Sequence, residues 1–248
     1  LKNPQKYLQN KDLINLIDHY FKYNINDLKT PSSVNEKSFK IFGYEKILSS
    51  TQCKNILKFN NIDYKTLNCY DTPEPLFDYI YKDSDAMNIL IIENKDTWYT
   101  IRKILREEKK SILNGLEINA IIYGEGNKIT SKRNSLTNYN DEVLKHSKNT
   151  YYYFGDLDYM GISIFENVVD TNKDLNIILA DKLYKDMLKN GENIELPITQ
   201  KNQTKKDMNY FLQHFNEYEK DKIMDILNSG KYIPQEILDY NYFITKFK

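Results

Sequence analysis

The sequence is poor in the residues that mark several common kinds of protein. It has two cysteines, Cys53 and Cys69, and three histidines. Two cysteines are too few for a disulfide framework or a zinc site, so a reducing compartment fits. No apolar run approaches the roughly 18 residues of a membrane span, and no segment reads as a signal peptide. We therefore expect a soluble, cytoplasmic protein without a membrane partner.

The sequence also lacks a net charge, because 35 basic side chains balance 35 acidic ones. The balance is uneven along the chain. Residues 1–60 carry a surplus of positive charge, whereas residues 61–98 are acidic. Such asymmetry allows a nucleic-acid face beside an acidic site, although solvated charge is the common case.

The first third of the chain favours helices. Apolar residues recur at helical spacing over 7–23, and a weaker helical pattern covers 45–59. Prolines and acids near residues 71–85 indicate a connector. We expect a mainly helical region over 1–84 and a second domain over 85–248. Because the first residue is leucine, we also expect the chain to be the C-terminal portion of a longer protein.

After residue 85, apolar strands alternate with helical segments. The first strand is a continuous apolar run, which is typical of a strand buried on both faces. This alternation predicts an α/β fold with a largely parallel sheet flanked by helices. The expected strands are 88–92, 118–124, 150–155 and 175–180, and the expected helices are 96–110, 139–147, 162–169, 181–190, 204–217 and 219–228.

Three carboxylates follow two of these strands. Glu93 follows the first strand, and Asp156 and Asp158 follow the third. Alternate residues of an extended chain point the same way, so both aspartates can face a ligand while Leu157 faces the core. If the strands are neighbours, the three carboxylates meet at one edge, where Mg²⁺ would relieve their repulsion. For each acid alone, the competing interpretation is a cap on the following helix.

Several motifs resemble a known module. "ENKDT" after a strand, the glycines of "YGEGNKI" after the next and "GDLDYMG" after the third resemble a Toprim domain. "NEKSFKIFGYEKIL", "LIIENKDTWYTI", "YYFGDLDYMGISIF" and "IPQEIL" resemble, in this order, the D subunit of Wadjet plasmid-defence systems. The resemblance covers most of residues 33–238.

The resemblance implies an activity and partners. It implies a DNA nuclease with Mg²⁺ or Mn²⁺ bound by Glu93, Asp156 and Asp158, and Glu93 as a possible general acid or base. It also implies a homodimer that acts with SMC-like, kleisin-like and accessory subunits. A winged-helix-like element is expected ahead of the Toprim domain, and residues 1–84 would be part of it.

The second strand is followed by candidate phosphate-binding residues. By the resemblance, Gly124 and Gly126 would let a DNA backbone approach closely. Lys128, Lys132 and Arg133 come next and can contact phosphates, or can belong to an ordinary solvated loop.

Three alternatives compete with a hydrolytic nuclease. The chain can be a non-catalytic DNA-binding or assembly subunit that uses the acids structurally. It can be an aspartyl-nucleophile phosphatase, although Met160 stands where that motif expects Thr or Val. Related enzymes use a tyrosine nucleophile, but no motif singles out Tyr44, Tyr64 or another tyrosine, so hydrolysis is favoured.

Overall fold

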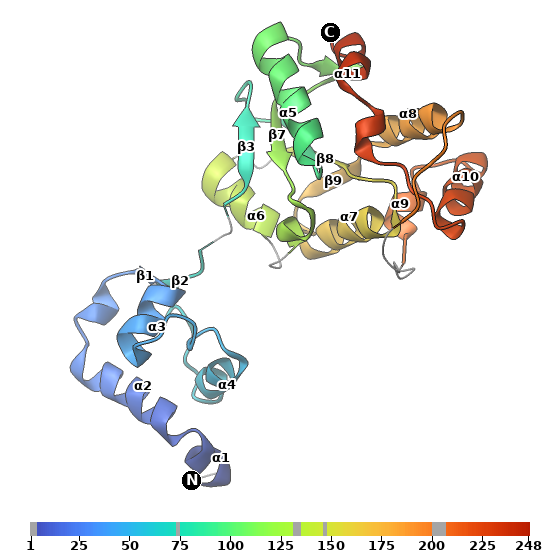
Figure 1. Cartoon of the computed structure of the whole chain (residues 1–248). Helices are drawn as coiled ribbons and strands as arrows, with labels where there is room; N and C mark the ends of the chain where they lie inside the picture. Colours follow the sequence, from blue (N-terminus) through green and yellow to red (C-terminus); the bar gives the residue numbers. More distant parts are fainter. Residues whose placement is uncertain (1–3, 73–74, 131–134, 146–147, 200–206) are drawn as a thin grey trace. The chain divides into compact units, whose positions relative to one another are not determined.

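The structure is a computed structural model of the chain, and it describes residues 4–72, 75–130, 135–145, 148–199 and 207–248. The chain forms two compact units, residues 1–73 and 74–248 (Figure 1). The division lies earlier than the boundary expected after residue 84. The reason is that residues 77–80, expected as part of a connector, form a strand of the main sheet.

The first unit is mainly helical. The predicted helix over 7–23 is interrupted at Asn10, and residues 34–42 form a helix that the sequence analysis did not predict. That helix begins with a capping box between Ser33 and Glu36 and ends at Gly43 in a left-handed conformation. The elements are α1 (Pro4–Gln9), α2 (Lys11–Tyr23), η1 (Asp27–Lys29), β1 (Ser32–Ser33), α3 (Val34–Phe42), α4 (Thr51–Phe59) and β2 (Cys69–Tyr70), with β1 and β2 parallel.

The second unit contains a five-stranded sheet of the predicted type. Its order is β3-β7-β4-β8-β9, and all neighbours are parallel except β3 and β7. The predicted parallel strands are therefore confirmed, and an antiparallel edge strand is added. The strands are β3 (Phe77–Ile80), β4 (Asn88–Ile92), β7 (Ala120–Tyr123), β8 (Thr150–Phe154) and β9 (Asn176–Leu179).

Helices cover the sheet, and β4 lies at its centre. Residues 89–92 are at most 1% exposed, as expected for a strand covered on both faces. Helix α5 packs against β4 and β7, and α11 packs against α5. None of the described helices is long and apolar enough to cross a membrane. The remaining elements are α5 (Lys95–Lys103), η2 (Ile104–Glu108), β5 (Ile112–Leu113), β6 (Leu116–Glu117), η3 (Gly126–Thr130), α6 (Ser135–Tyr139), η4 (Asn140–Leu144), α7 (Tyr159–Thr171), α8 (Asp181–Gly191), α9 (Asn209–Leu212), α10 (Glu217–Asn228), η5 (Gln235–Ile237) and α11 (Tyr240–Lys246).

Candidate active site

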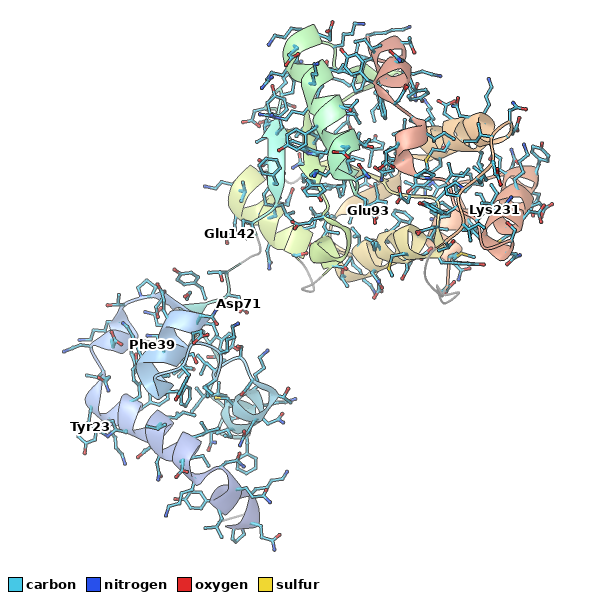
Figure 2. All side chains as sticks on the ribbon, viewed as in Figure 1. Tyr23, Phe39, Asp71, Glu93, Glu142 and Lys231 are labelled. Carbon is cyan, nitrogen blue, oxygen red and sulfur yellow. The ribbon has the colours of Figure 1, made fainter. Side chains whose placement is uncertain are left out.

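Glu93 lies at the carboxyl edge of the sheet. Strand β4 pairs with β8 in a register that sets Ile92 opposite Phe154, and the Glu93 N–H donates to the Phe154 carbonyl at 3.0 Å. The strands predicted to carry the acids are therefore direct neighbours. Figure 2 labels Glu93 within the second unit. This is the edge at which α/β sheets bind ligands.

The Glu93 side chain is held by β8 and by the loop after it. The Tyr153 hydroxyl donates to Oε2 at 3.0 Å, and the Asp156 backbone N–H also donates to the carboxylate. Burial raises the pKa of Glu93 to about 7, and the negative charges of Asp156 and Asp158 add to the rise. Glu93 is thus a carboxyl group that exchanges its proton near neutral pH.

Asp156 is the second perturbed carboxyl group. Its Oδ1 accepts a hydrogen bond of 2.8 Å from the Gln235 backbone N–H. Burial raises the pKa of Asp156 to about 6 against the effect of that hydrogen bond, and the charges of Asp158 and Glu236 also raise it. Each perturbed carboxyl group therefore stands among other acids.

Asp158 has a structural role in addition to its place near the other acids. Its Oδ1 accepts from the Gly161 N–H at 2.6 Å, so it is the N-cap of α7. The competing interpretation, that an acid after the strand caps the following helix, is therefore correct for Asp158. Leu157, between the two aspartates, is fully buried and faces the core as expected.

Two glycines make room for this arrangement. A Cβ atom on Gly155 would lie 2.4 Å from Oε2 of Glu93, and one on Gly161 would lie 2.4 Å from the Asp156 carbonyl oxygen. Both distances are far inside van der Waals contact. At Gly161 the clash is with backbone, so glycine is required there, whereas a methyl group at Gly155 would meet the movable end of the Glu93 side chain.

A segment near the C-terminus crosses the same edge. Ile233 and Leu157 exchange backbone hydrogen bonds of 2.9 and 3.2 Å. Gln235 contacts both strand ends, and the Asn94 side chain donates to Glu236 at 2.7 Å. The segment "IPQEIL" is part of the resemblance described above, but no role was predicted for its residues. Asn94 is the N-cap of α5, and its side-chain oxygen accepts from the N–H groups of Asp96 and Thr97.

The candidate phosphate-binding residues are only partly described. Gly124 follows β7 beside Glu93, and a Cβ atom there would make an ordinary 3.5 Å contact with Ile91. Gly126 has a φ of +58°, and nothing lies within 4 Å of its Cβ position. Lys128 belongs to η3, which packs against α7, and its side chain is not described. Lys132 and Arg133 lie outside the described residues.

A match to one protein-family model shows the family to which the chain belongs. The model for the C-terminal part of the Wadjet protein JetD matches residues 62–244. The chain belongs to the JetD C-terminal family. No curated protein matches the chain. The match includes the whole sheet and all three acids, which places this site within the family's C-terminal part and the chain among proteins of Wadjet plasmid defence.

In this JetD-family chain, the carboxylate oxygens of Glu93, Asp156 and Asp158 are of the kind that binds a hard divalent cation. They are not arranged around a single ion position. Among the described residues, no group of three or more His, Cys, Asp or Glu side chains is arranged to hold an ion. Each carboxylate nevertheless has two oxygens and about four acceptor positions, so the hydrogen bonds above do not prevent ligation. Burial and repulsion raise the pKa values of Glu93 and Asp156. A bound cation would favour the charged carboxylates and so lower both pKa values. The chemistry of these carboxylates therefore suits a hard cation, although they are not arranged as a metal site in the described part of the chain.

Proposed function

We propose that the chain is a Toprim-type, metal-dependent endonuclease subunit of a Wadjet system that hydrolyses phosphodiester bonds of plasmid DNA. The observation that carries the proposal is the pair Glu93 and Asp156, which follow two adjacent parallel strands and each have a pKa raised by burial and by other acids. If Glu93 and Asp156 had only a structural role, the repulsion between these carboxylates would serve no purpose. Strongly perturbed carboxyl groups at a sheet edge are typical of functional sites.

The residues divide the chemistry between them. A Mg²⁺ or Mn²⁺ ion, when bound, supplies Lewis acidity toward a phosphodiester and activates water. Asp156 and Asp158 are its proposed ligands, together with Glu93. With a pKa of about 7 before metal binding, Glu93 can also take up or release a proton at neutral pH. Gly124 and Gly126 would admit the DNA backbone next to this edge.

The two tyrosines considered as nucleophiles have opposite environments. The Tyr64 hydroxyl is buried without a hydrogen-bond partner, and burial raises its pKa to about 12. Tyr44 is 69% exposed. A neutral, buried phenol is a poor nucleophile, and an exposed one has no neighbouring base among the contacts described. Neither of these two tyrosines is therefore placed as an activated nucleophile.

The proposed partners follow from the same family. The subunit would form a homodimer and act on DNA with SMC-like, kleisin-like and accessory subunits, its N-terminal unit contributing part of a winged-helix-like element. Two copies would bring one carboxylate cluster to each DNA strand. Light scattering of the purified chain should give twice its mass of 29.5 kDa, and a monomer would count against the dimer.

The deciding experiment uses closed circular plasmid. The protein is incubated with Mg²⁺ or Mn²⁺, with and without its partner subunits, and the products are separated on gels. We expect nicked or linear DNA from the wild type and none from Glu93→Gln, which keeps the size of the side chain but not its charge. Equal cleavage by both proteins would contradict the proposal.

A second candidate is a non-catalytic assembly subunit. Two observations favour it. Asp158 serves as the N-cap of α7, and the described part of the chain holds no preformed cluster of metal ligands. Such a subunit would support cleavage by its partners equally well with Glu93→Gln. The reconstituted complex containing that variant therefore separates the two candidates.

A further inference from the structure

Gln235 joins three points of the carboxylate edge. Its side-chain Nε2 donates to the Phe154 carbonyl at 2.9 Å, and its Oε1 accepts from the Asn94 N–H at 3.3 Å. Its backbone N–H donates to Oδ1 of Asp156 at 2.8 Å. One residue thus contacts the end of β4, the end of β8 and one proposed metal ligand.

The side chain is also fully buried. Gln235 is 0% exposed, although amides are mostly found on protein surfaces. A buried amide is tolerated when its donor and acceptor are satisfied, and here both satisfy backbone groups at the two strand ends. The fixed side chain therefore fixes the backbone N–H that holds Asp156.

We propose that Gln235 is a positioning residue, which sets the separation of Glu93 and Asp156 and so strengthens cation binding. Residues 233–237 act as a strap across the edge. The strap is anchored to the loop after β8 by the backbone bonds between Ile233 and Leu157 and to Asn94 by Glu236. Gln235 acts through Asp156 and the strand ends and does not itself bind the ion.

The inference rests on the proposed function but has its own readout. Residues that orient metal ligands typically change metal affinity about 10–100-fold when they are replaced. Gln235→Met keeps nearly the same volume and loses both side-chain hydrogen bonds. We expect calorimetric titration to give at least a tenfold weaker Mn²⁺ affinity for this variant than for the wild type.

A matched control removes an equally buried amide elsewhere. Asn172 is 0% exposed, and its side chain accepts from the N–H groups of Leu136 and Thr137 and donates to the Val168 carbonyl. It lies just past the far end of α7, about 20 Å along the helix from Asp158. Asn172→Leu should lose comparable stability while it keeps Mn²⁺ affinity within about twofold of the wild type.

The outcomes are distinct. Normal Mn²⁺ affinity in Gln235→Met would overturn the inference, as would an equal loss in Asn172→Leu, which would indicate general loosening. A wild type that binds no Mn²⁺ would overturn the proposed function and the inference with it. If the wild type binds Mn²⁺ and Gln235→Met binds it with the same affinity, only the inference would be overturned.

A measurement on the wild type covers the case in which Gln235→Met does not fold. Mg²⁺ is diamagnetic, so NMR can follow amide signals during its titration. We expect the backbone and side-chain amide signals of Gln235 to shift with the same midpoint as the binding isotherm, while those of Asn172 stay in place. An unshifted Gln235 would refute its coupling to the site.

Discussion

The Tyr153 hydroxyl lies 3.0 Å from Oε2 of Glu93, so a fully buried tyrosine donates a hydrogen bond to the carboxylate that follows the neighbouring strand. The bond favours the charged form of Glu93 and opposes the effect of burial on its pKa. In Tyr153→Phe this opposition is lost. We expect the pKa of Glu93 to rise above about 7 in the metal-free protein, measured by NMR titration of the side-chain carboxyl carbon.

Tyr151 offers a control on the same strand and the same face. Its hydroxyl donates to Oδ1 of Asn140 at 2.7 Å, and it is equally buried. Tyr151→Phe should lose a similar hydrogen bond and leave the Glu93 titration unchanged. Equal shifts in both variants would show that the hydroxyl of Tyr153 has no specific effect.

The pH dependence of stability follows from the raised pKa values. The folded state keeps the Glu93 proton up to a pKa of about 7, whereas the unfolded chain releases it near the ordinary value of 4.5. Between these values the native state binds more protons, so the stability of the metal-free protein should fall as pH rises. We expect a loss on the order of 2 kcal/mol across this window, measured by urea unfolding in EDTA.

Asp156→Asn should reduce this loss. The substitution removes a charge that raises the pKa of Glu93, while its side-chain oxygen can still accept from the Gln235 N–H. The variant should therefore be more stable than the wild type at alkaline pH in EDTA. If it is less stable at every pH, repulsion at this edge is not the dominant effect.

Asp158 requires two substitutions, because it caps a helix and also contributes charge. Asp158→Ala should cost about 1 kcal/mol through the lost cap, whereas Asp158→Asn retains a good N-cap. Both should weaken the rise in melting temperature that Mn²⁺ causes in the wild type. Thermal melts in EDTA and in Mn²⁺ separate the two effects. An undiminished rise in Asp158→Asn would remove Asp158 from the ligand set.

Gly155→Ala tests the close approach of Glu93. The new methyl group would lie 2.4 Å from Oε2, and the flexible carboxylate can turn away from it. We expect a folded protein with a markedly smaller response to Mn²⁺. Gly124→Ala, where the contact is an ordinary 3.5 Å, should keep the wild-type response in the same thermal melts. A normal response in Gly155→Ala would show that the position of Glu93 is not critical.

The parallel sheet was predictable because its strands are continuous apolar runs. Asn88–Ile92 was predicted with its observed bounds. Strand β3 was missed, since "FDYI" alternates with an acid, lies after two prolines and is an edge strand with no buried residue. Its pairing with β7 depends on a partner 40 to 46 residues away, which no local pattern reveals.

The meeting of Glu93 and Asp156 at one sheet edge was predictable, but the contacts that support these side chains were not. Glu93 and Asp156 follow strands, and parallel neighbours bring such positions to one edge. Gln235 and Asn94 are separated by 141 residues. A single buried glutamine has no periodic signal in the sequence, so only the fold shows that it meets the strand ends.

The strap over the carboxylate edge sets the order in which the contacts of the site form during synthesis. Strands β4 and β8 can pair once residue 154 has left the ribosome, but the hydrogen bond from Gln235 to Phe154 spans a further 81 residues. Contacts of such large separation form late. A nascent chain that has not reached residue 235 therefore lacks the hydrogen bonds from Gln235 to Asp156 and Phe154. The proposed support of the cation site by Gln235 can therefore form only after residue 235 has been synthesised.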